Sequence, residues 1–288
     1  MSKVLVIGST VIDVVLNVEA LPTSGSDVHV YSQEMMLGGC AYNVHRGLSY
    51  HHIDHTLYSP IGKGVFAEKV NYELSKEGIT LSLQSDEDNG CCYCLIEPSG
   101  ERSFICHRGA EYRFKKEWFD TLNMEEYDTV YLCGLELEEK TAIHLVDFVC
   151  AHPSLSVYFA PGPRVNKIEK DLLNRLLNRG VIVHMNEEEL INLTQETNLN
   201  KALSKLYKQT NQKIITSLGD KGAILFDGEK MYQAFVSKVK VENTNGAGDA
   251  HIAGMIAAKQ LKMDNLQALE FANNYASKVV MVKESYLK

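Results

Sequence analysis

Residues 129–160 read TVYLCGLELEEKTAIHLVDFVCAHPSLSVYFA. This stretch opens with a short apolar run at Thr129–Gly134, passes through a helix-like segment at Glu138–Ala151, and returns to an apolar run at Val157–Ala160. Short apolar runs without alternation are typical of strands that are buried on both faces of a parallel sheet. The stretch therefore predicts a strand–helix–strand unit with a right-handed crossover.

The same alternation continues on both sides of this unit. Further apolar runs lie at Val4–Gly8, Val181–Asn186 and Lys213–Gly219, and further helix-like segments lie at Ala67–Lys76, Lys167–Leu177 and Asn200–Tyr207. We therefore expect an α/β fold with a doubly wound, mostly parallel sheet flanked by helices.

Two segments interrupt this rhythm. Val14–Met36 and Cys91–His107 alternate polar and apolar residues, and each contains a turn signal, at Pro22–Gly25 and Pro98–Gly100. Such a pattern predicts antiparallel strands, and the second segment reads as a hairpin. Because no linker or low-complexity stretch is present, we expect a single domain over residues 1–288. The interrupting segments, at about 14–37 and 90–110, would form a small antiparallel β-sheet.

Composition limits the possible partners. The chain has 288 residues, of which 45% are apolar and 23% are charged, as in globular domains. Its 29 Lys and Arg against 37 Asp and Glu give a net charge of −8, so we expect no nucleic-acid partner. The sequence contains no run of about 18 apolar residues, so we expect no membrane span. The seven cysteines are odd in number and no signal sequence precedes Val4–Gly8, which favours reduced thiols and a cytoplasmic protein.

The segment Gly246-Ala247-Gly248-Asp249 stands before a helix of small residues at Ala250–Ala258. Glycines at a helix start let backbone N–H groups approach an anion, and the helix dipole favours negative charge there. A carboxylate beside a bound phosphate can take the proton of an attacking hydroxyl. In the alternative interpretation, the glycines only make a tight turn and Asp249 caps the helix.

Other polar residues follow the ends of predicted strands, where ligands bind in open α/β sheets. Asn186 and Glu189 follow one strand, and Ser217, Gly219 and Gly222 follow the next. The sequence has no GxxxxGK[ST] phosphate loop and no GxGxxG dinucleotide motif. Phosphate chemistry would therefore need the turn at Gly246–Asp249 and a metal held by carboxylate or amide oxygens.

Four motifs, in the expected order along nearly the whole chain, resemble those of the ribokinase (PfkB) family of carbohydrate and nucleoside kinases. They are Gly38-Gly39-x-x-x-Asn43, Asn186-x-x-Glu189, Ser217-Leu218-Gly219-x-x-Gly222, and Asn243–Gly254, which reads NTNGAGDAHIAG. The resemblance implies that Asp249 is the general base and that the N–H groups of Gly246, Ala247 and Gly248 form the anion hole. It also implies a small β-sheet lid over the substrate, through which members of the family often form homodimers.

The resemblance implies further roles for residues at the ends of strands. Asn186 and Glu189 would orient Mg²⁺ through water, and Asn186 would also help to bind ATP. Substrate hydroxyls would be held by Asp13, Gly38, Gly39 and Asn43, with Arg108 at the exit of the lid as a further substrate contact. The nucleotide site would be lined by Ser217, Gly219, Gly222, Thr244 and Asn273.

The sequence also departs from the pattern of the family. Asn243 replaces the first Asp of the signature, and the sequence stops at Lys288 without the Gly-Ala segment of many members. Both departures weaken the case for a K⁺ site. His251 replaces the usual Phe, and residues 160–164 read APGPR, without the acidic and amide side chains of the related segment. These two departures leave the identity of the substrate open.

Several clusters have simpler interpretations. In the cluster of Cys91, Cys92, Cys94 and Cys106, the side chains of Cys92 and Cys94 share one face of a predicted strand while Cys91 takes the other, which argues against a zinc site. His45, His51, His52 and His55 are expected at a solvated helix end. His251 is expected to fill the space of the usual Phe, and Arg108, where it does not contact substrate, would pair with a carboxylate of the lid.

We therefore expect a kinase that transfers the γ-phosphoryl group of Mg-ATP to a hydroxymethyl group of a sugar. One alternative is a nucleoside kinase of the same fold, whose base pocket would be formed by Tyr31, Tyr42, Phe104 and Tyr112. Another is a non-catalytic regulatory protein that binds a sugar or a nucleotide. The presence of Asp249, Asn186 and Glu189 argues against this second alternative.

Overall fold

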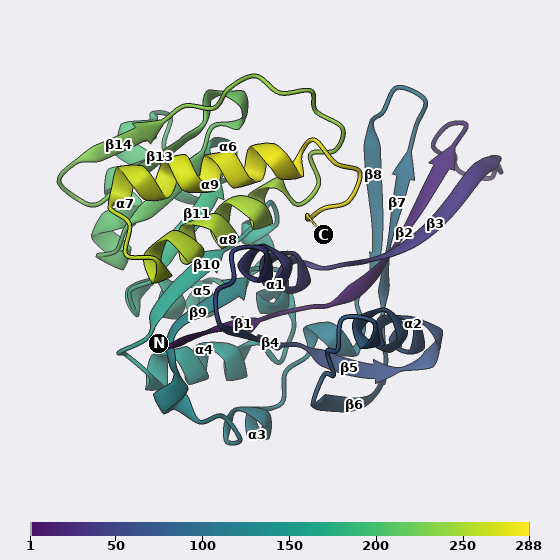
Figure 1. The fold of residues 1–288 in the computed structure, drawn as a ribbon, viewed down its shortest axis with the longest axis horizontal. Coiled ribbons are helices and arrows are strands. Elements are labelled where there is room, and N and C mark those ends of the chain that lie inside the picture. The colour runs from purple at the N-terminus through teal and green to yellow at the C-terminus, as the bar shows by residue number, and fades with distance from the viewer. Residues whose placement is uncertain (1, 288) are drawn as a thin grey trace.

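A central sheet organises residues 2–287, the part of the chain that the computed structural model describes (Figure 1). Its eight strands lie in the order β14-β13-β12-β11-β10-β9-β1-β4. Their bounds are β1 Lys3–Ile7, β4 His55–Tyr58, β9 Tyr127–Cys133, β10 Ser156–Ala160, β11 Ile182–Asn186, β12 Ile214–Ser217, β13 Ala223–Phe226 and β14 Met231–Ala234. Neighbouring strands pair in parallel across six strands of this sheet: β4, β1, β9, β10, β11 and β12. β13 and β14 extend the sheet beyond β12 with antiparallel pairs.

Helices cover both faces of this sheet (Figure 1). One layer contains α4 Ala142–Ala151, α5 Lys170–Asn178, α6 Glu187–Thr194 and α7 Leu199–Thr210, and the other contains α1 Cys40–Tyr50, α8 Ala247–Gln260 and α9 Asn265–Val279. In β1, the side chains of Leu5 and Ile7 pack in the core under the first helix layer, whereas those of Val4 and Val6 pack in the core under the second layer. This division explains why the strand is an unbroken apolar run. The predicted doubly wound, mostly parallel sheet is confirmed.

A second sheet stands beside the first, in the order β3-β2-β7-β8 (Figure 1). Its strands are β2 Val11–Val18, β3 Val30–Gly38, β7 Cys91–Ile96 and β8 Arg102–His107, and we call these four strands the lid. The pairs β2–β3 and β7–β8 are antiparallel, as expected, while β2 and β7 join them by a parallel pairing.

One face of the lid is covered by a further layer. This layer contains α2 Gly64–Ser75 and the short sheet of β5 Pro60–Lys63 and β6 Leu83–Asp88. Ile12 and Val14 pack into the core shared with α2. Because side chains alternate along a strand, Asp13 points to the opposite face of the lid.

Some helix boundaries differ from the expected ones. The helix expected from Glu138 begins at Ala142, because Glu136–Glu138 form a separate 3₁₀ turn in which Glu136 is buried. Likewise, Val165–Lys167 form a 3₁₀ turn before α5. The short helix α3 Lys116–Phe119 was not expected. None of the helices within residues 2–287 has the length and apolar character needed to cross a membrane.

Candidate active site

The turn before α8 is built to leave its backbone accessible. Gly246 caps the helix with φ 79°, in the left-handed region that favours glycine, and a Cβ there would overlap the Ser285 carbonyl. At Gly248 a Cβ would find no atom within 4 Å, so this part of the first turn faces open space. The N–H of Ala247 instead donates to the Thr244 carbonyl at 3.2 Å. The backbone N–H groups of Gly246 and Gly248 can therefore bind an anion, whereas that of Ala247 is hydrogen-bonded within the turn itself.

Asp249 lies in the first turn of α8 and is half-buried. Asn43, from the first turns of α1, donates from Nδ2 to Asp249 Oδ2 at 2.8 Å. Burial raises the pKa of Asp249 to about 6, against the lowering effect of the hydrogen bonds from Asn43 and Cys40. The buried Glu136 carboxyl adds a further rise. Asp249 is therefore ionised at neutral pH and can accept a proton.

Asp13 lies at the face of the lid that turns toward Asp249. Burial raises the pKa of Asp13 to about 7, and the negative groups of Cys106 and Asp249 add to the rise. A Cβ at Gly38, on the neighbouring strand, would overlap the Asp13 carboxylate. Gly39 has φ 97°, and a Cβ there would overlap the Ser9 carbonyl. Both glycines are therefore required for the close approach of the lid to the start of α1.

A cavity of about 570 Å³ opens on the other side of the α8 turn. It is lined by residues that the sequence predicted for the nucleotide site or the anion hole. These residues are Ser217, Gly219, Gly222, Thr244, Ala247, Gly248 and, on α9, Asn273. Asn273 is buried and donates from Nδ2 to the Ala234 carbonyl at 3.0 Å. Gly222 has φ 91°, and a Cβ there would overlap the same carbonyl.

The cavity has an apolar wall that the sequence motifs did not reveal. Val236, Val239 and Val241 line it from the loop between β14 and α8, Ala276 lines it from α9, and Val280 lines it from the position directly after α9. An apolar wall opposite polar residues suits a flat heterocycle that is joined to a charged group. The signal that could have identified the loop is its alternation of valine with Ser and Lys over residues 236–241.

Asn186 and Glu189 lie at the same edge of the sheet, where Asn186 pairs in register with Ser217. The two residues form a capping box for α6. Asn186 Oδ1 accepts from the Glu189 N–H at 2.8 Å, and Glu189 Oε2 accepts from the Asn186 N–H at 3.0 Å. Burial raises the pKa of Glu189. Because the cap uses the only side-chain oxygen of Asn186 and one of the two carboxylate oxygens of Glu189, this pair suits Mg²⁺ held through water, as Mg²⁺ often is.

Comparison with known proteins identifies the family of the chain. The family model described as "pfkB family carbohydrate kinase" matches residues 1–287. The chain belongs to this family. The predicted family and the predicted carbohydrate kinase class are therefore confirmed.

Individual relatives support the same assignment. The chain is 30% identical over 283 residues to the uncharacterized sugar kinase YegV of Escherichia coli, covering 96% of this chain and 88% of the relative. It is 25% identical to the ribokinase of Arabidopsis thaliana, covering 97% of this chain and 76% of the relative. The ribokinase structure from Thermotoga maritima superposes with a TM-score of 0.85 at 22% identity, covering 99% and 95% of the two chains, which shows the shared fold.

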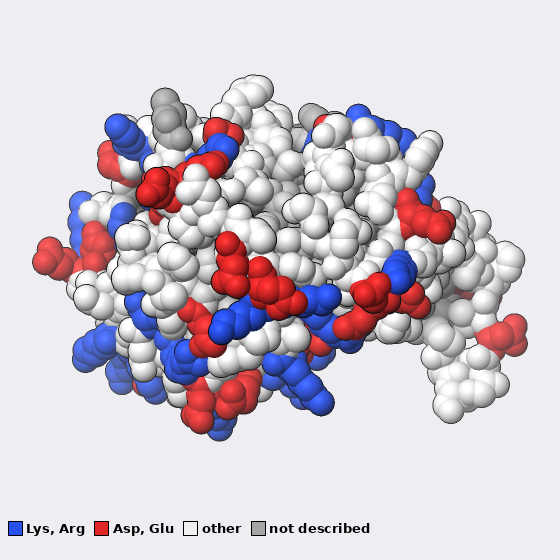
Figure 2. Space-filling view, turned by 90° about the horizontal axis from the view of Figure 1, so that it is seen from below, with Lys and Arg blue, Asp and Glu red and all other residues white. Residues whose placement is uncertain are grey.

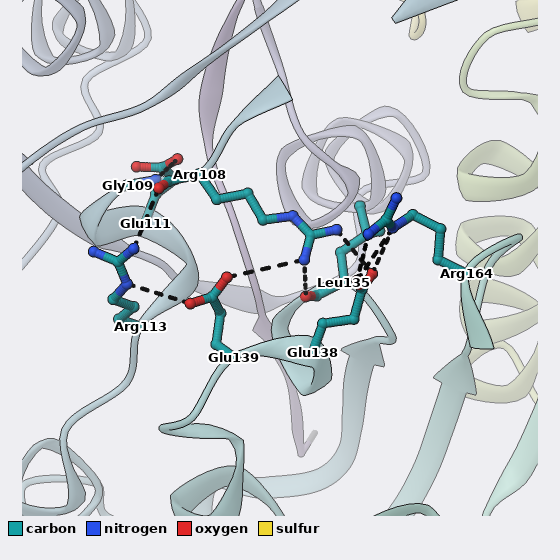
Figure 3. A network of polar contacts seen from close by, with 8 residues as sticks. All are labelled: Arg108, Gly109, Glu111, Arg113, Leu135, Glu138, Glu139 and Arg164. Atoms are coloured by element: carbon teal, nitrogen blue, oxygen red, sulfur yellow. Dashed lines mark hydrogen bonds and ion pairs between the residues drawn. The ribbon is translucent and has the colours of Figure 1, made fainter. Parts of the chain in front are cut away.

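In this pfkB family member, three loops meet at one carboxylate, that of Glu138 (Figure 3). Arg108, after β8, donates from Nη2 to Glu138 Oε1 at 2.8 Å. Arg164, after β10, donates from Nη2 to Oε2 at 2.7 Å. The side chains of Glu138 and Arg108 are only 7% and 17% exposed, so their ion pair is largely shielded from solvent, whereas the Arg164 side chain is 53% exposed. The network joins the exit of the lid to the loops that follow β9 and β10.

The network differs from what the sequence predicted for Arg108 and for Glu138. Arg108 does pair with a carboxylate, but Glu138 follows the central strand β9 and is not part of the lid. Glu139 extends the network, because it also pairs with Arg113 at 3.3 Å (Figure 3). Sequence reasoning missed Glu138, which it placed at the start of a helix.

His251 does pack in the core, as expected, but it also makes a polar contact. It is 4% exposed, and its Nδ1 lies 2.8 Å from Nε2 of His184 on β11. Burial lowers the pKa of His251 to about 4 and lowers that of His184 well below its usual range, so both rings are neutral at pH 7. His251 also lines the 570 Å³ cavity.

Two of the simpler interpretations concern the clusters of cysteine and histidine. Within residues 2–287 no group of three or more metal-ligating side chains is found. The expectation of solvated histidines is wrong for His45, which is buried on α1 and hydrogen-bonded at 2.7 Å to His55. The cause is the packing of α1 onto β4, which covers the face of the helix that carries His45.

Proposed function

We propose that this protein transfers the γ-phosphoryl group of ATP to a hydroxymethyl group of a carbohydrate, with Asp249 as general base. The observation that carries the proposal is the position of Asp249. It directly follows Ala247 and Gly248, which line the 570 Å³ cavity, and its negative charge acts on Asp13 of the lid. An acceptor hydroxyl and a nucleotide phosphate can therefore meet beside one carboxylate.

The acceptor would bind against the lid. Asp13 and Asn43 offer a carboxylate and an amide to sugar hydroxyls, and Gly38 and Gly39 leave the space for them. Asn43 also fixes the orientation of Asp249 by the 2.8 Å hydrogen bond. Arg108 would reach substrate only through a change in its contact with Glu138.

The nucleotide would bind in the cavity, with its base against the apolar wall near Asn273 and its phosphates at the α8 turn. The N–H groups of Gly246, Ala247 and Gly248 would stabilise the transferring group. Mg²⁺, held through water by Asn186 and Glu189, would neutralise phosphate charge when bound. Since the chain carries a net charge of −8, these local groups must provide the attraction for ATP.

A nucleoside acceptor receives less support from the structure. Of the four aromatic side chains considered for a base pocket, Tyr42 is fully buried and donates to Glu77 at 2.7 Å. Tyr112 is also buried, whereas Tyr31 and Phe104 are exposed on the lid. A relative named nucleoside kinase, from Methanocaldococcus jannaschii, is 23% identical over 264 residues and covers 90% of this chain and 83% of the relative. The choice of acceptor therefore needs a direct measurement.

We further propose a cytoplasmic protein that forms a homodimer through the lid. Figure 2 shows few charged side chains on the projection at the right, where the strands of the lid lie in Figure 1. Three large apolar side chains of the lid are at least half exposed: Tyr31, Phe104 and Ile105. Exposed apolar groups of this kind mark interaction surfaces.

The test is ADP release with Mg-ATP and a panel of ribose, fructose, sugar acids and nucleosides. We expect turnover of a sugar, and we expect Asp249→Asn to lower kcat by about 10²–10⁴-fold, the range for loss of a general base. Asp171→Asn, at an exposed position of α5, is the matched control and keeps the parent rate. A near-normal rate for Asp249→Asn would refute the assignment, and tight ligand binding without any turnover would favour the regulatory alternative.

A further inference from the structure

Cys92 and Cys106 lie directly opposite each other on β7 and β8. Their sulfur atoms are 3.0 Å apart, and both thiols are free. A disulfide bond is about 2.05 Å long, and it spans Cα atoms about 4.4–6.8 Å apart, a range that includes directly opposed residues of antiparallel strands. Bond formation therefore requires a movement of only about 1 Å.

This pair lies on the face of the lid that carries Asp13. Cys92 is in register with Asp13 of β2 on one side and with Cys106 of β8 on the other. Side chains in register across neighbouring strands share a face. The effect of Cys106 on the pKa of Asp13 agrees with this placement.

The two thiols have different chemistry. Cys106 is exposed, and its pKa falls to about 7, chiefly because Cys92 donates a hydrogen bond to its sulfur. Burial opposes this fall, and the guanidinium groups of Arg108 and Arg164 support it. The same hydrogen bond, together with burial, raises the pKa of Cys92. Cys106 is therefore the nucleophile, and Cys92 is the thiol placed to resolve its adducts.

We propose that Cys92 and Cys106 form a reversible disulfide beside the acceptor site, by exchange with a low-molecular-weight disulfide. Formation of the disulfide does not depend on the proposed function, whereas the identity of the neighbouring site as an acceptor site does. The Cys106 thiolate attacks one sulfur of the oxidant, which gives a mixed disulfide and releases one thiolate. That thiolate takes the proton of Cys92, whose sulfur then attacks Cys106 and releases the second thiolate. This second thiolate takes up from water the proton that Cys106 had released to it. The protein loses two electrons and two protons, and the oxidant is reduced to two thiols.

The consequence falls on Asp13. A disulfide carries no charge, so oxidation removes the sulfur anion that helps to raise the pKa of Asp13. The other charged groups at this face, namely Asp249, Arg108 and Arg164, are unchanged by the exchange. Oxidation should therefore let Asp13 ionise at lower pH, and it should leave the nucleotide cavity on the far side of α8 unaffected.

The test uses the full-length protein and glutathione disulfide at pH 8. After oxidation, free thiols are alkylated and the cysteine peptides are identified by mass spectrometry. We expect the loss of two alkylatable thiols, those of Cys92 and Cys106, and their return with dithiothreitol. Cys92→Ser should stop at one glutathione bound to Cys106. Cys150→Ser, on α4, is the matched control and should oxidise as the parent does.

Three results would separate the parts of the proposal. The disulfide is overturned if Cys92 and Cys106 remain alkylatable, or if the parent protein stops at the mixed disulfide. Its effect on the site is overturned if the disulfide forms but the acidic limb of kcat/KM for the acceptor does not move to lower pH. If the disulfide forms but no acceptor is turned over, the proposed function fails and the thiol assignment stands.

Discussion

The substitution Asp13→Asn tests the acceptor site most directly, because it removes one of two carboxyls that titrate near neutrality. The pKa of Asp13 is raised to about 7 and that of Asp249 to about 6. The pH profile of kcat/KM reports groups of the free enzyme. If both carboxylates are needed, kcat/KM of the parent falls tenfold per pH unit below about 7 and a hundredfold per unit below about 6.

The size of the effect follows from these two values. At pH 5 a carboxyl with pKa 7 is ionised in about one molecule in 100, and one with pKa 6 in about one in 10, so the parent retains about 10⁻³ of its plateau. Asp13→Asn removes the first factor and should retain about 10⁻¹ of its own plateau. That plateau should be lower by about 10–100-fold, because a hydrogen bond to a charged group contributes about 1.5–3 kcal/mol.

The assay is ADP release at subsaturating acceptor and saturating Mg-ATP, from about pH 5 to pH 9. A parallel profile at subsaturating ATP serves as control, since Asp13 does not line the nucleotide cavity. The reasoning is refuted if parent and variant show the same slope below pH 6. It is also refuted if the variant keeps the parent plateau, because Asp13 would then not contact the acceptor.

Three further substitutions test other parts of the site. Asn43→Ala removes the hydrogen bond that lowers the pKa of Asp249, so the lower limb of the same profile should move up by about one pH unit, and an unmoved limb would count against this contact. Glu189→Gln should raise the Mg²⁺ concentration needed for half-maximal rate without changing KM for the sugar, and an unchanged requirement would remove Glu189 from the metal site. Gly222→Ala would push a Cβ against the Ala234 carbonyl and should raise KM for ATP several-fold with the acceptor KM unchanged, so equal changes in both would indicate general unfolding.

The sequence predicted the central sheet because its strands are apolar on both faces. β1, β9, β10, β11 and β12 all lie within the apolar runs or one or two residues from their ends. β4, β13 and β14 were not predicted, because each has only four residues. β4 and β14 also lie at the two edges of the sheet, and β14 keeps exposed side chains. Four residues are too few to show a clear period.

The candidate site was predictable where it consists of motifs at strand ends. Parallel strands deliver their carboxyl ends to one edge, so Asn186 and Ser217, which end β11 and β12, could be expected near one another. The contact of Glu138 with Arg108 and Arg164 was not predictable, because it joins three loops whose distance depends on the complete fold. The pair of His184 and His251 was hidden for a related reason, since each histidine interrupts an otherwise apolar segment and only their packing brings them together.

Asn243 shows that a departure from a family signature can have a structural cause. Its Nδ2 donates to the Lys283 carbonyl at 2.6 Å, and its Oδ1 accepts from the Asn245 N–H at 2.7 Å and from Arg102 of β8. A carboxylate could accept both of the latter bonds, but it could not donate to the carbonyl. A carboxylate would instead place a negative oxygen against the Lys283 carbonyl oxygen, and that carbonyl would lose its hydrogen-bond donor.

The amide at position 243 therefore connects three parts of the chain with one side chain. These parts are the turn before α8, the segment after α9 and the lid. Lys283 strengthens the same connection, because its ammonium group pairs with Glu34 of β3. The lid is thus held from the segment after α9 through β3 and the start of β8, and Arg108, directly after the end of β8, pairs with Glu138. Contacts at both ends of β8 limit the movement of the lid and so help to keep Asp13 near Asp249, which is the geometry that the proposed transfer requires.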